Sequence, residues 1–313
     1  MRGSRVAASH AWLMAFLVGL SGQSLSSLAA PPKNAAMMQQ RCARASDSVW
    51  VVKKGRGDCI RYFSSGLNEE NPIALVFFHG DLMPQRGGRG GRGGHSGWSD
   101  SQPEVLRSEM RAVSQRSDIP VIFVARPGVF GSTGDHAERR RPREVELMNL
   151  ALDEIKKRHN IERFALAGQS SGGHLVGALL SNRNDVKCAA MASGVVAVRA
   201  RAHAHGWSAD ATGYRDFYDP IDHVDEIAES PDLTIFVIGD EKDSNVPFRT
   251  QKMYFDKLLK RGLDAHLVRA KGNGPEHHGL AHCGIRIAGL CAQNRNASET
   301  INMVRASKSS CAL

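Results

Sequence analysis

Apolar runs of strand length alternate with helical patterns along most of this chain, and that alternation restricts the fold more than any other feature. The runs that we interpret as buried strands are 73–78, 120–124, 164–167, 186–193, 233–238 and 265–268. The helical patterns between and after them span 103–115, 144–159, 172–181, 248–260 and 279–292. Strands and helices in this order form crossover units, so the pattern predicts an α/β fold: a mostly parallel, twisted sheet with helices on both faces.

The composition is that of a soluble globular protein. Hydrophobic residues make up 42% and charged residues 23% of the 313 residues, which excludes wholesale disorder and fibrous repeats. The chain has no internal repeat and no second core, so we predict a single domain over 30–313. Near its start, the runs 49–52 and 59–63 flank a Gly-containing turn and predict a hairpin.

Two segments interrupt the alternation. Residues 195–230 join one predicted strand to the next without a strong period, and we predict a small cap there, because connections of this length usually serve a function. The other segment is an Arg-Gly-Gly repeat, which predicts a flexible loop over 85–98. Together with a net charge of +9, this cationic loop indicates local attraction for anions.

The first thirty residues have the order of charged, apolar and small residues that is typical of a secretory signal peptide. Arg2 and Arg5 precede an apolar run over 11–20, and small residues follow up to Ala29, after which we predict cleavage. The run is too short to span a bilayer of ~30 Å as a helix, so we expect no transmembrane segment after cleavage. A signal peptide over 1–29 predicts an exported protein, periplasmic or extracellular.

The six cysteines fit export, because an oxidising compartment favours disulfide bonds. Six cysteines allow many pairings and the sequence does not choose among them, although proximity favours Cys42–Cys59. No C-x-x-C pair occurs, so neither a redox motif nor a zinc site has support.

The chemistry of the chain centres on the motif Gly168-Gln169-Ser170-Ser171-Gly172, which joins a predicted strand to a predicted helix. A serine at the tip of such a turn is held above the sheet, and the flanking glycines leave room for the turn. The helix N-terminus brings a backbone N–H and a positive dipole end close to the hydroxyl. We therefore predict that Ser170 is a nucleophile.

A nucleophilic serine needs a base, and the base needs a carboxylate that orients it. Asp240 and Asp243 follow the strand 233–238, and His277 and His278 follow the last predicted strand. Both pairs belong at the carboxyl edge of a parallel sheet, where such sheets gather ligands. We prefer His278 as the base, because the glycine after it allows a tight turn into the last helix, and His277 remains the competing residue.

With the acid ahead of the histidine in chain order, the chain resembles the α/β-hydrolases from about residue 47 to about 292. The motifs that carry the resemblance are the turn at Ser170, His79-Gly80-Asp81, the run 239–247 and the Gly-rich run that ends at His278-Gly279. Residues 218–224 are similar to the prolyl oligopeptidase branch of serine peptidases. In that branch a bulky aromatic residue often follows the serine, and its absence here leaves peptidase specificity open.

The resemblance implies a role for each site residue. Ser170 would attack the carbonyl carbon of an ester or amide, His278 would accept its proton, and Asp243 would orient that histidine. Asp243 is preferred to Asp240 because a Val-Pro pair follows it at the family's spacing. The backbone N–H groups of Ser171 and Asp81 would stabilise the oxyanion.

Two basic stretches receive structural interpretations. A loop like the one that holds Arg126 braces the sheet under the active site in related hydrolases, so we expect a structural role for that arginine. The run 139–143 contains four arginines, and we interpret it as a solvated face ahead of a helix.

We therefore predict an exported serine hydrolase, a carboxylesterase or peptidase that forms an acyl-enzyme with a small-molecule ester or a short peptide. No metal or organic cofactor is needed, because the nucleophile, base and oxyanion donors are all protein groups. We expect no obligate nucleic-acid partner, and the oligomeric state stays open. The alternative is a catalytically inactive protein of the same fold that binds polyanions through its Arg-Gly-Gly loop.

Overall fold

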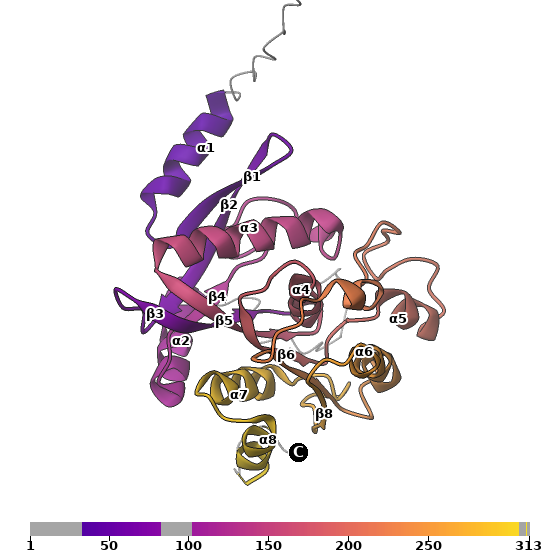
Figure 1. The fold of residues 1–313 in the computed structure, drawn as a ribbon. Helices are drawn as coiled ribbons and strands as arrows, with labels where there is room; N and C mark the ends of the chain where they lie inside the picture. Colours follow the sequence, from indigo (N-terminus) through magenta and orange to yellow (C-terminus); the bar gives the residue numbers. More distant parts are fainter. Residues whose placement is uncertain (1–32, 83–101, 307–310, 312–313) are drawn as a thin grey trace, which may run out of the picture.

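The computed structural model describes residues 33–82, 102–306 and 311, and its centre is one eight-stranded sheet (Figure 1). The strands lie in the order β1-β2-β4-β3-β5-β6-β7-β8. Their bounds are β1 Ser48–Lys53, β2 Arg56–Ser65, β3 Asn71–Phe78, β4 Val121–Val124, β5 Ile161–Gln169, β6 Val186–Ala192, β7 Thr234–Gly239 and β8 Ala265–Arg269. Strands β3 to β8 pair parallel with one another, whereas β2 pairs antiparallel with both β1 and β4. The predicted α/β fold and the predicted hairpin are confirmed.

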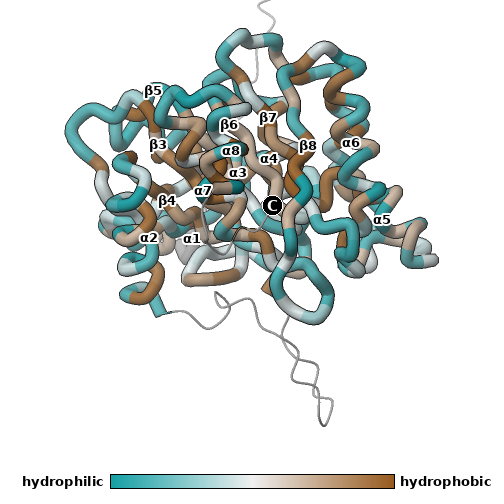
Figure 2. Tube along the Cα trace, turned by 90° about the horizontal axis from the view of Figure 1, so that it is seen from below, coloured by the Kyte–Doolittle hydropathy of each residue, from teal (hydrophilic) through white to brown (hydrophobic). Residues whose placement is uncertain are grey.

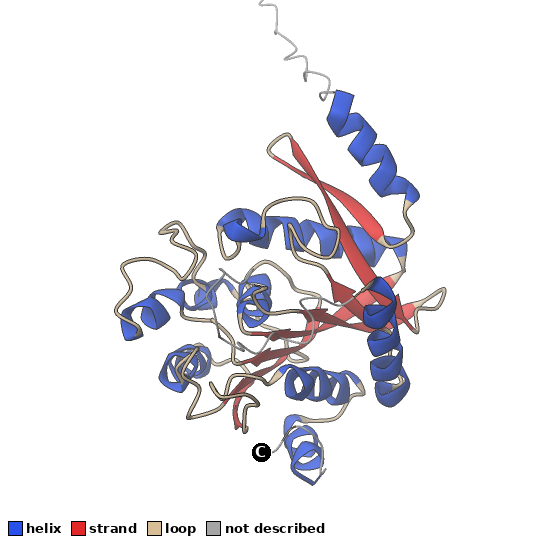
Figure 3. Cartoon of the chain, turned by 180° about the vertical axis from the view of Figure 1, so that it is seen from behind, coloured by secondary structure: helices blue, strands red, loops and turns tan. Residues whose placement is uncertain are grey.

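Helices cover both faces of the sheet (Figures 1 and 3). The helices are α1 Lys33–Arg44, α2 Pro103–Ser117, α3 Pro142–Arg158, α4 Ser171–Leu180, α5 Val198–Ala204, α6 Phe248–Lys260, α7 Ala281–Ala292 and α8 Ala297–Ala306. One buried apolar cluster joins the sheet to α3, α4 and α6, and a second joins its other face to α2, α7 and α8. Figure 2 accordingly has hydrophobic strands inside and hydrophilic loops outside.

Strand β5 illustrates why the sheet is buried on both sides. Phe164 and Leu166 belong to the first cluster and Ala165 and Ala167 to the second, as the alternation of side chains along a strand requires. A strand with both faces covered can be apolar throughout, which explains the continuous apolar runs in the sequence.

Three disulfides connect elements that are distant in sequence. Cys42–Cys59 ties α1 to the hairpin and confirms the pairing that proximity favoured. Cys188–Cys291 ties β6 to α7, and Cys283–Cys311 ties α7 to the C-terminal segment. Within residues 33–82 and 102–306, no helix combines the length and the apolar character that crossing a membrane requires.

Two of the sequence-based assignments lie outside what the structure describes. The signal peptide over 1–29 and the loop over 85–98 fall on residues that are not described. The region 195–230 is described and contains α5 and the short 3-10 helix η2, Pro220–Glu226. Because the parallel strands end at one edge of the sheet, the segments after β3, β5, β7 and β8 meet there, and the predicted site residues lie on those segments.

Candidate active site

Ser170 occupies the sharp turn between β5 and α4, which we call the elbow (residues 168–172). Its backbone angles are φ 57° and ψ −118°, a combination that non-glycine residues rarely adopt and that stores strain. The neighbouring strand end holds the turn, because the Ser170 N–H donates to the Ala192 carbonyl at 2.9 Å and the Val195 N–H donates to the Ser170 carbonyl at 3.0 Å. The strain is thus imposed by well-paired surroundings.

The glycines of the elbow are required by close backbone contacts. A Cβ atom placed on Gly172 would lie 2.1 Å from the Phe78 carbonyl oxygen, and one on Gly168 would lie 2.2 Å from the carbonyl oxygen of Gly172. Contacts that short do not occur between real atoms of these types. Packing of the turn against the end of β3 therefore explains the G-x-S-x-G spacing.

His278 is paired with a buried carboxylate. Its Nδ1 atom lies 2.9 Å from Asp243 Oδ2, and the Asp243 side chain is completely buried. The other oxygen, Oδ1, accepts the N–H groups of Asn245 and Val246 at 2.9 and 2.8 Å. A carboxylate can only accept, so Nδ1 carries the proton and the Nε2 lone pair is left for another proton.

The competing residues form a separate and looser pair. His277 Nδ1 lies 3.4 Å from Asp240 Oδ2, and the His277 side chain is 44% exposed against 16% for His278. Both oxygens of Asp240 already accept backbone N–H groups, those of Lys242 and Gly272, at 2.8 Å each. Asp240 thus stabilises the turn, whereas the Asp243 carboxylate orients an imidazole.

Direct hydrogen bonds connect the elbow with two loops: the acid loop (residues 240–247) and the histidine loop (residues 270–280). Gln169 Nε2 donates to the His278 carbonyl at 3.0 Å, and the Ser244 N–H donates to the Glu276 carbonyl at 3.0 Å. The Ser170 hydroxyl has no hydrogen-bond partner among the described residues. Catalytic hydrogen bonds of this kind are often long in a free enzyme and shorten when substrate binds.

Two backbone donors are available beside Ser170. Ser171 is the first residue of α4, so its N–H has no partner within the helix. The loop after β3 passes the serine so closely that a Cβ atom on Gly80 would lie 3.3 Å from Ser170 Cβ. Neither the Asp81 nor the Ser171 N–H makes a hydrogen bond to any described residue, which leaves both groups free for an oxyanion.

The Asp81 side chain lies in a buried arginine cluster behind the site. Its carboxylate is 3.4 Å from Arg126 Nη1, 2.9 Å from Arg139 Nε and 2.6 Å from Arg140 Nη1. Burial alone would raise the pKa of Asp81, but the surrounding arginines, Arg140 above all, outweigh it and hold that pKa well below its usual range. The ion pairs fix the loop and leave only its backbone for the reaction.

The same arginines hold the start of α4. Arg126 Nη2 and Arg140 Nη1 donate to the Ser171 hydroxyl at 2.9 and 2.8 Å, while Glu144 and Asp210 balance their charges. The bracing role expected for Arg126 is therefore confirmed. The interpretation of 139–143 as a solvated face is wrong for Arg139 and Arg140, which are 6% and 0% exposed because carboxylates from distant segments surround them.

Two neutral histidines, of which His79 is buried and His136 half-buried, complete this support. His79 Nδ1 donates to the Gly80 carbonyl at 2.6 Å, and burial holds the pKa of His79 well below its usual range. The Leu82 N–H donates to His136 Nε2 at 3.3 Å, and burial, reinforced by the charge of Arg126, lowers the pKa of His136 to about 4. Both histidines hold the loop 79–82 in their uncharged forms.

The sequence analysis did not predict helix α5. Arg201 on this helix and His205 directly after it both contact the acid loop. Arg201 donates from Nε and Nη2 to the carbonyl and side-chain oxygens of Asn245, at 2.9 and 2.8 Å. His205 Nε2 donates to the same carbonyl at 2.9 Å. A weak helical period and scattered arginines gave no signal for these contacts in the sequence.

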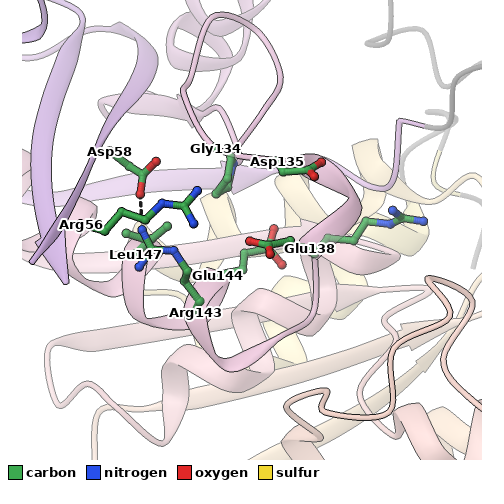
Figure 4. Close-up of a pocket in the computed structure, with 10 residues that line it drawn as sticks. Arg56, Asp58, Gly134, Asp135, Glu138, Arg143, Glu144 and Leu147 are labelled. Atoms are coloured by element: carbon green, nitrogen blue, oxygen red, sulfur yellow. Dashed lines mark hydrogen bonds and ion pairs between the residues drawn. The ribbon is translucent and has the colours of Figure 1, made fainter. Parts of the chain in front are cut away.

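Two cavities among the described residues lie away from the elbow. One, of ≈ 10 Å³, is lined by charged side chains that include Asp58, Arg143 and Glu144 (Figure 4). The other is an open groove of ≈ 630 Å³ between α5, η2 and α6. Neither is lined by Ser170 or His278, and the described residues contain no cluster of three or more metal-ligating side chains.

Comparison with known families adds an independent result. The chain matches the prolyl oligopeptidase family over residues 148–284, which contain the elbow, both candidate acids and both candidate histidines. A comparison with curated protein sequences found no significant match.

Solved structures resemble most of this chain in fold. The Pyrococcus horikoshii acylaminoacyl peptidase is 13% identical, with a TM-score of 0.53 over 82% of this chain and 41% of that chain. A puromycin-hydrolyzing peptidase of Mycobacterium tuberculosis is 18% identical, with a TM-score of 0.54 over 85% of this chain and 41% of that one. The Pyrococcus furiosus esterase Pf2001 is 10% identical, with a TM-score of 0.55, over 82% of this chain and 94% of that one.

The chain therefore spans less than half the length of the two peptidases and a similar length to the esterase. These similarities give the α/β-hydrolase fold. Together with the family match, they support a serine hydrolase.

Proposed function

We propose that this protein is an exported serine hydrolase that cleaves an ester or peptide bond through an acyl-enzyme on Ser170. The observation that carries the proposal is the pair His278–Asp243, 2.9 Å apart, on loops that are hydrogen-bonded to the elbow. The pairing leaves Nε2 of the imidazole able to accept a proton. The strained serine of the elbow, which is hydrogen-bonded through Gln169 to the backbone of His278, is a nucleophile of the kind that such a base activates.

The reaction then proceeds in two steps. Ser170 Oγ attacks the carbonyl carbon of the substrate while His278 Nε2 takes the hydroxyl proton, and His278 returns that proton to the leaving group. Water attacks the acyl-enzyme with the same histidine as base. Asp243 keeps the proton on Nδ1 and stabilises the imidazolium that forms in each step.

The oxyanion receives the backbone N–H groups of Ser171 and Asp81. Losing one such donor typically costs ~100–1000-fold in rate. The arginine cluster contributes indirectly, since it fixes both residues through the Ser171 hydroxyl and the Asp81 carboxylate. Donors that are already oriented need no rearrangement when charge develops on the substrate oxygen.

Substrate class and location rest on separate observations. The structural relatives include two peptidases and an esterase, so a small ester and a short peptide are both substrates to be tested. Three disulfides are in keeping with an oxidising compartment, and they support export.

A fluorophosphonate probe tests the proposal on the disulfide-bonded protein without residues 1–29. We expect the wild type to be labelled, S170A to be unlabelled, and H278A to react slower by ~10³-fold or more. H277A is the matched control and should react like the wild type. Labelling that survives S170A, or that is lost in H277A and kept in H278A, would overturn the assignment. Absence of labelling in the folded wild type would favour the polyanion-binding alternative.

A further inference from the structure

Arg201 is a buried cation on the α5 helix. It is 7% exposed, and its hydrogen bonds go to the carbonyl and side-chain oxygens of Asn245, which are both neutral. Asn245 follows Asp243 by two residues, so the arginine is anchored on the loop that holds the proposed catalytic acid. The anchoring fixes the guanidinium in one place, so it loses little further conformational entropy when a ligand binds.

The other buried arginines near the site have carboxylate partners. Arg126 lies 2.8 Å from Glu144, and Arg140 lies 2.8 Å from Asp210. Arg201 has no carboxylate within ion-pair distance among the described residues. Burying a charge without a counter-charge is costly, and proteins usually compensate for it.

The position of Arg201 places its charge among the groups of the proposed active site. Burial lowers the pKa of its guanidinium, Arg140 lowers it further, and three nearby carboxylates raise it: those of Asp81, Asp210 and Asp243. An arginine remains protonated nonetheless. Asp81 and Asp243 are both engaged by other partners, so neither neutralises Arg201.

One nitrogen of the Arg201 guanidinium, Nη1, has no hydrogen-bond partner among the described residues. Nε and Nη2 donate to Asn245, whereas Nη1 makes no hydrogen bond with the described residues. This atom is also not among the completely buried polar atoms that lack a partner, so the described residues do not fully enclose it. An oriented N–H donor on a full positive charge is what a carboxylate binds most strongly.

An apolar surface adjoins this cation. The Trp207 ring lies 5.1 Å below the Arg201 guanidinium, stacks on His205 at 4.3 Å, and is 41% exposed. A ligand that combines a carboxylate with an apolar portion would match this surface.

We propose that Arg201 binds a carboxylate on the substrate, with Trp207 contacting the adjoining apolar part. This inference rests on the proposed function and specifies its substrate class, namely esters or peptides that carry a free carboxylate close to the bond that is cleaved. It also explains why this buried cation of α5 lacks a counter-charge in the free protein: the substrate provides it.

The test compares two esters that differ in one charge. Mono-p-nitrophenyl succinate carries a carboxylate, and p-nitrophenyl butyrate has a similar length without one. We expect the wild type to favour the succinate in kcat/KM, and R201Q to reduce that preference by ~10–100-fold, the loss expected for a charge-assisted hydrogen bond. R201K keeps the charge and should restore part of the preference.

Arg199 provides a matched control on the other side of α5. Its side chain is 67% exposed and pairs with Asp222 at 3.0 Å, so R199Q should leave the preference unchanged. A purely structural role for Arg201 would lower the rates on both esters together and leave their ratio constant. A constant ratio in R201Q, or a wild type that prefers the neutral ester, would overturn the inference.

Fluorophosphonate labelling of the same preparations separates the two proposals. Labelled protein with an unchanged ratio refutes only the role of Arg201, whereas wild type that is not labelled refutes the hydrolase itself. If R201Q does not fold, inhibition of the wild type gives the same comparison: succinate should compete with the neutral ester, and neutral succinamide should not. Equal inhibition by both would also overturn the inference.

Discussion

Replacing Asp243 by asparagine tests the proposed triad at the residue where the structure predicts the consequence most directly. Oδ1 of Asp243 accepts two backbone N–H groups, and Oδ2 faces His278 Nδ1. In D243N those two N–H donors select the orientation of the new amide, because only its oxygen can accept them. Its NH2 group therefore faces the histidine.

The reversed amide forces the other tautomer on the imidazole. An NH2 group opposite Nδ1 requires Nδ1 to accept, so the proton of the neutral His278 moves to Nε2. In that form the histidine offers Ser170 a donor and cannot take the hydroxyl proton. A wrong tautomer in a triad typically costs ~10⁴ in kcat, or about 5 kcal/mol in the barrier.

The assay is kcat/KM on a neutral ester, corrected for the fraction of folded protein, with D240N as the matched control. In D240N one backbone N–H loses its acceptor, so unfolding should become easier by about 1–3 kcal/mol while the rate per folded molecule stays near that of the wild type. A D243N variant that keeps the wild-type kcat/KM, or a D240N variant whose kcat/KM falls by ~10⁴-fold, would refute the reasoning.

Two further predictions concern stability. G172A should lose about 3 kcal/mol or more of unfolding free energy in urea, because its methyl group would lie 2.1 Å from a β3 carbonyl oxygen. G274A is the control: its methyl group would meet open space, so only the backbone strain at φ +83° should destabilise it, by ~1–2 kcal/mol. Equal losses in the two variants would contradict the packing argument. Folding lowers the pKa of His136 to about 4, so as the pH falls this histidine is protonated in the unfolded chain before it is protonated in the folded protein. Keeping His136 neutral therefore contributes to stability above pH ~6.5, and this contribution is lost as the pH falls toward 4. H136Q should therefore lose less stability between pH 7 and pH 4.5 than the wild type does, and an identical loss would exclude His136 as the cause.

Features that depend on local periodicity were predictable from the sequence. The buried strands and most helices appear where apolar runs and helical spacing indicate them. A strand covered on both faces is a continuous apolar run, which is easy to recognise in a sequence. The helix α8 was missed because its ten residues span fewer than three helical turns, which is too short for a period to be recognised. The pairing of β2 with β4 was also out of reach, because register between distant strands leaves no local signal.

The buried charges were the largest gap. Arg140 belongs to a basic run that is typical of a solvated face, yet it is completely buried, because its partners Asp81 and Asp210 lie 59 and 70 residues away in sequence. No spacing rule connects such residues. Likewise, His277 and His278 are adjacent, and only the fold distinguishes them, since the left-handed φ of +54° at His277 turns the chain so that the two side chains face different carboxylates.

The strain at Ser170 and the charge buried behind it are two parts of one arrangement. A serine with positive φ persists only if the surrounding structure prevents relaxation, and here the Ser171 hydroxyl is held by Arg126 and Arg140 while the Asp81 carboxylate is held by the same two side chains. The cluster thus fixes the two backbone donors beside the proposed nucleophile. Arg201 differs from these arginines in one respect: it is anchored by neutral groups and keeps a free donor. Arginines whose charges are satisfied by the protein build the site, and the one whose charge is not satisfied is the one that a substrate can recognise.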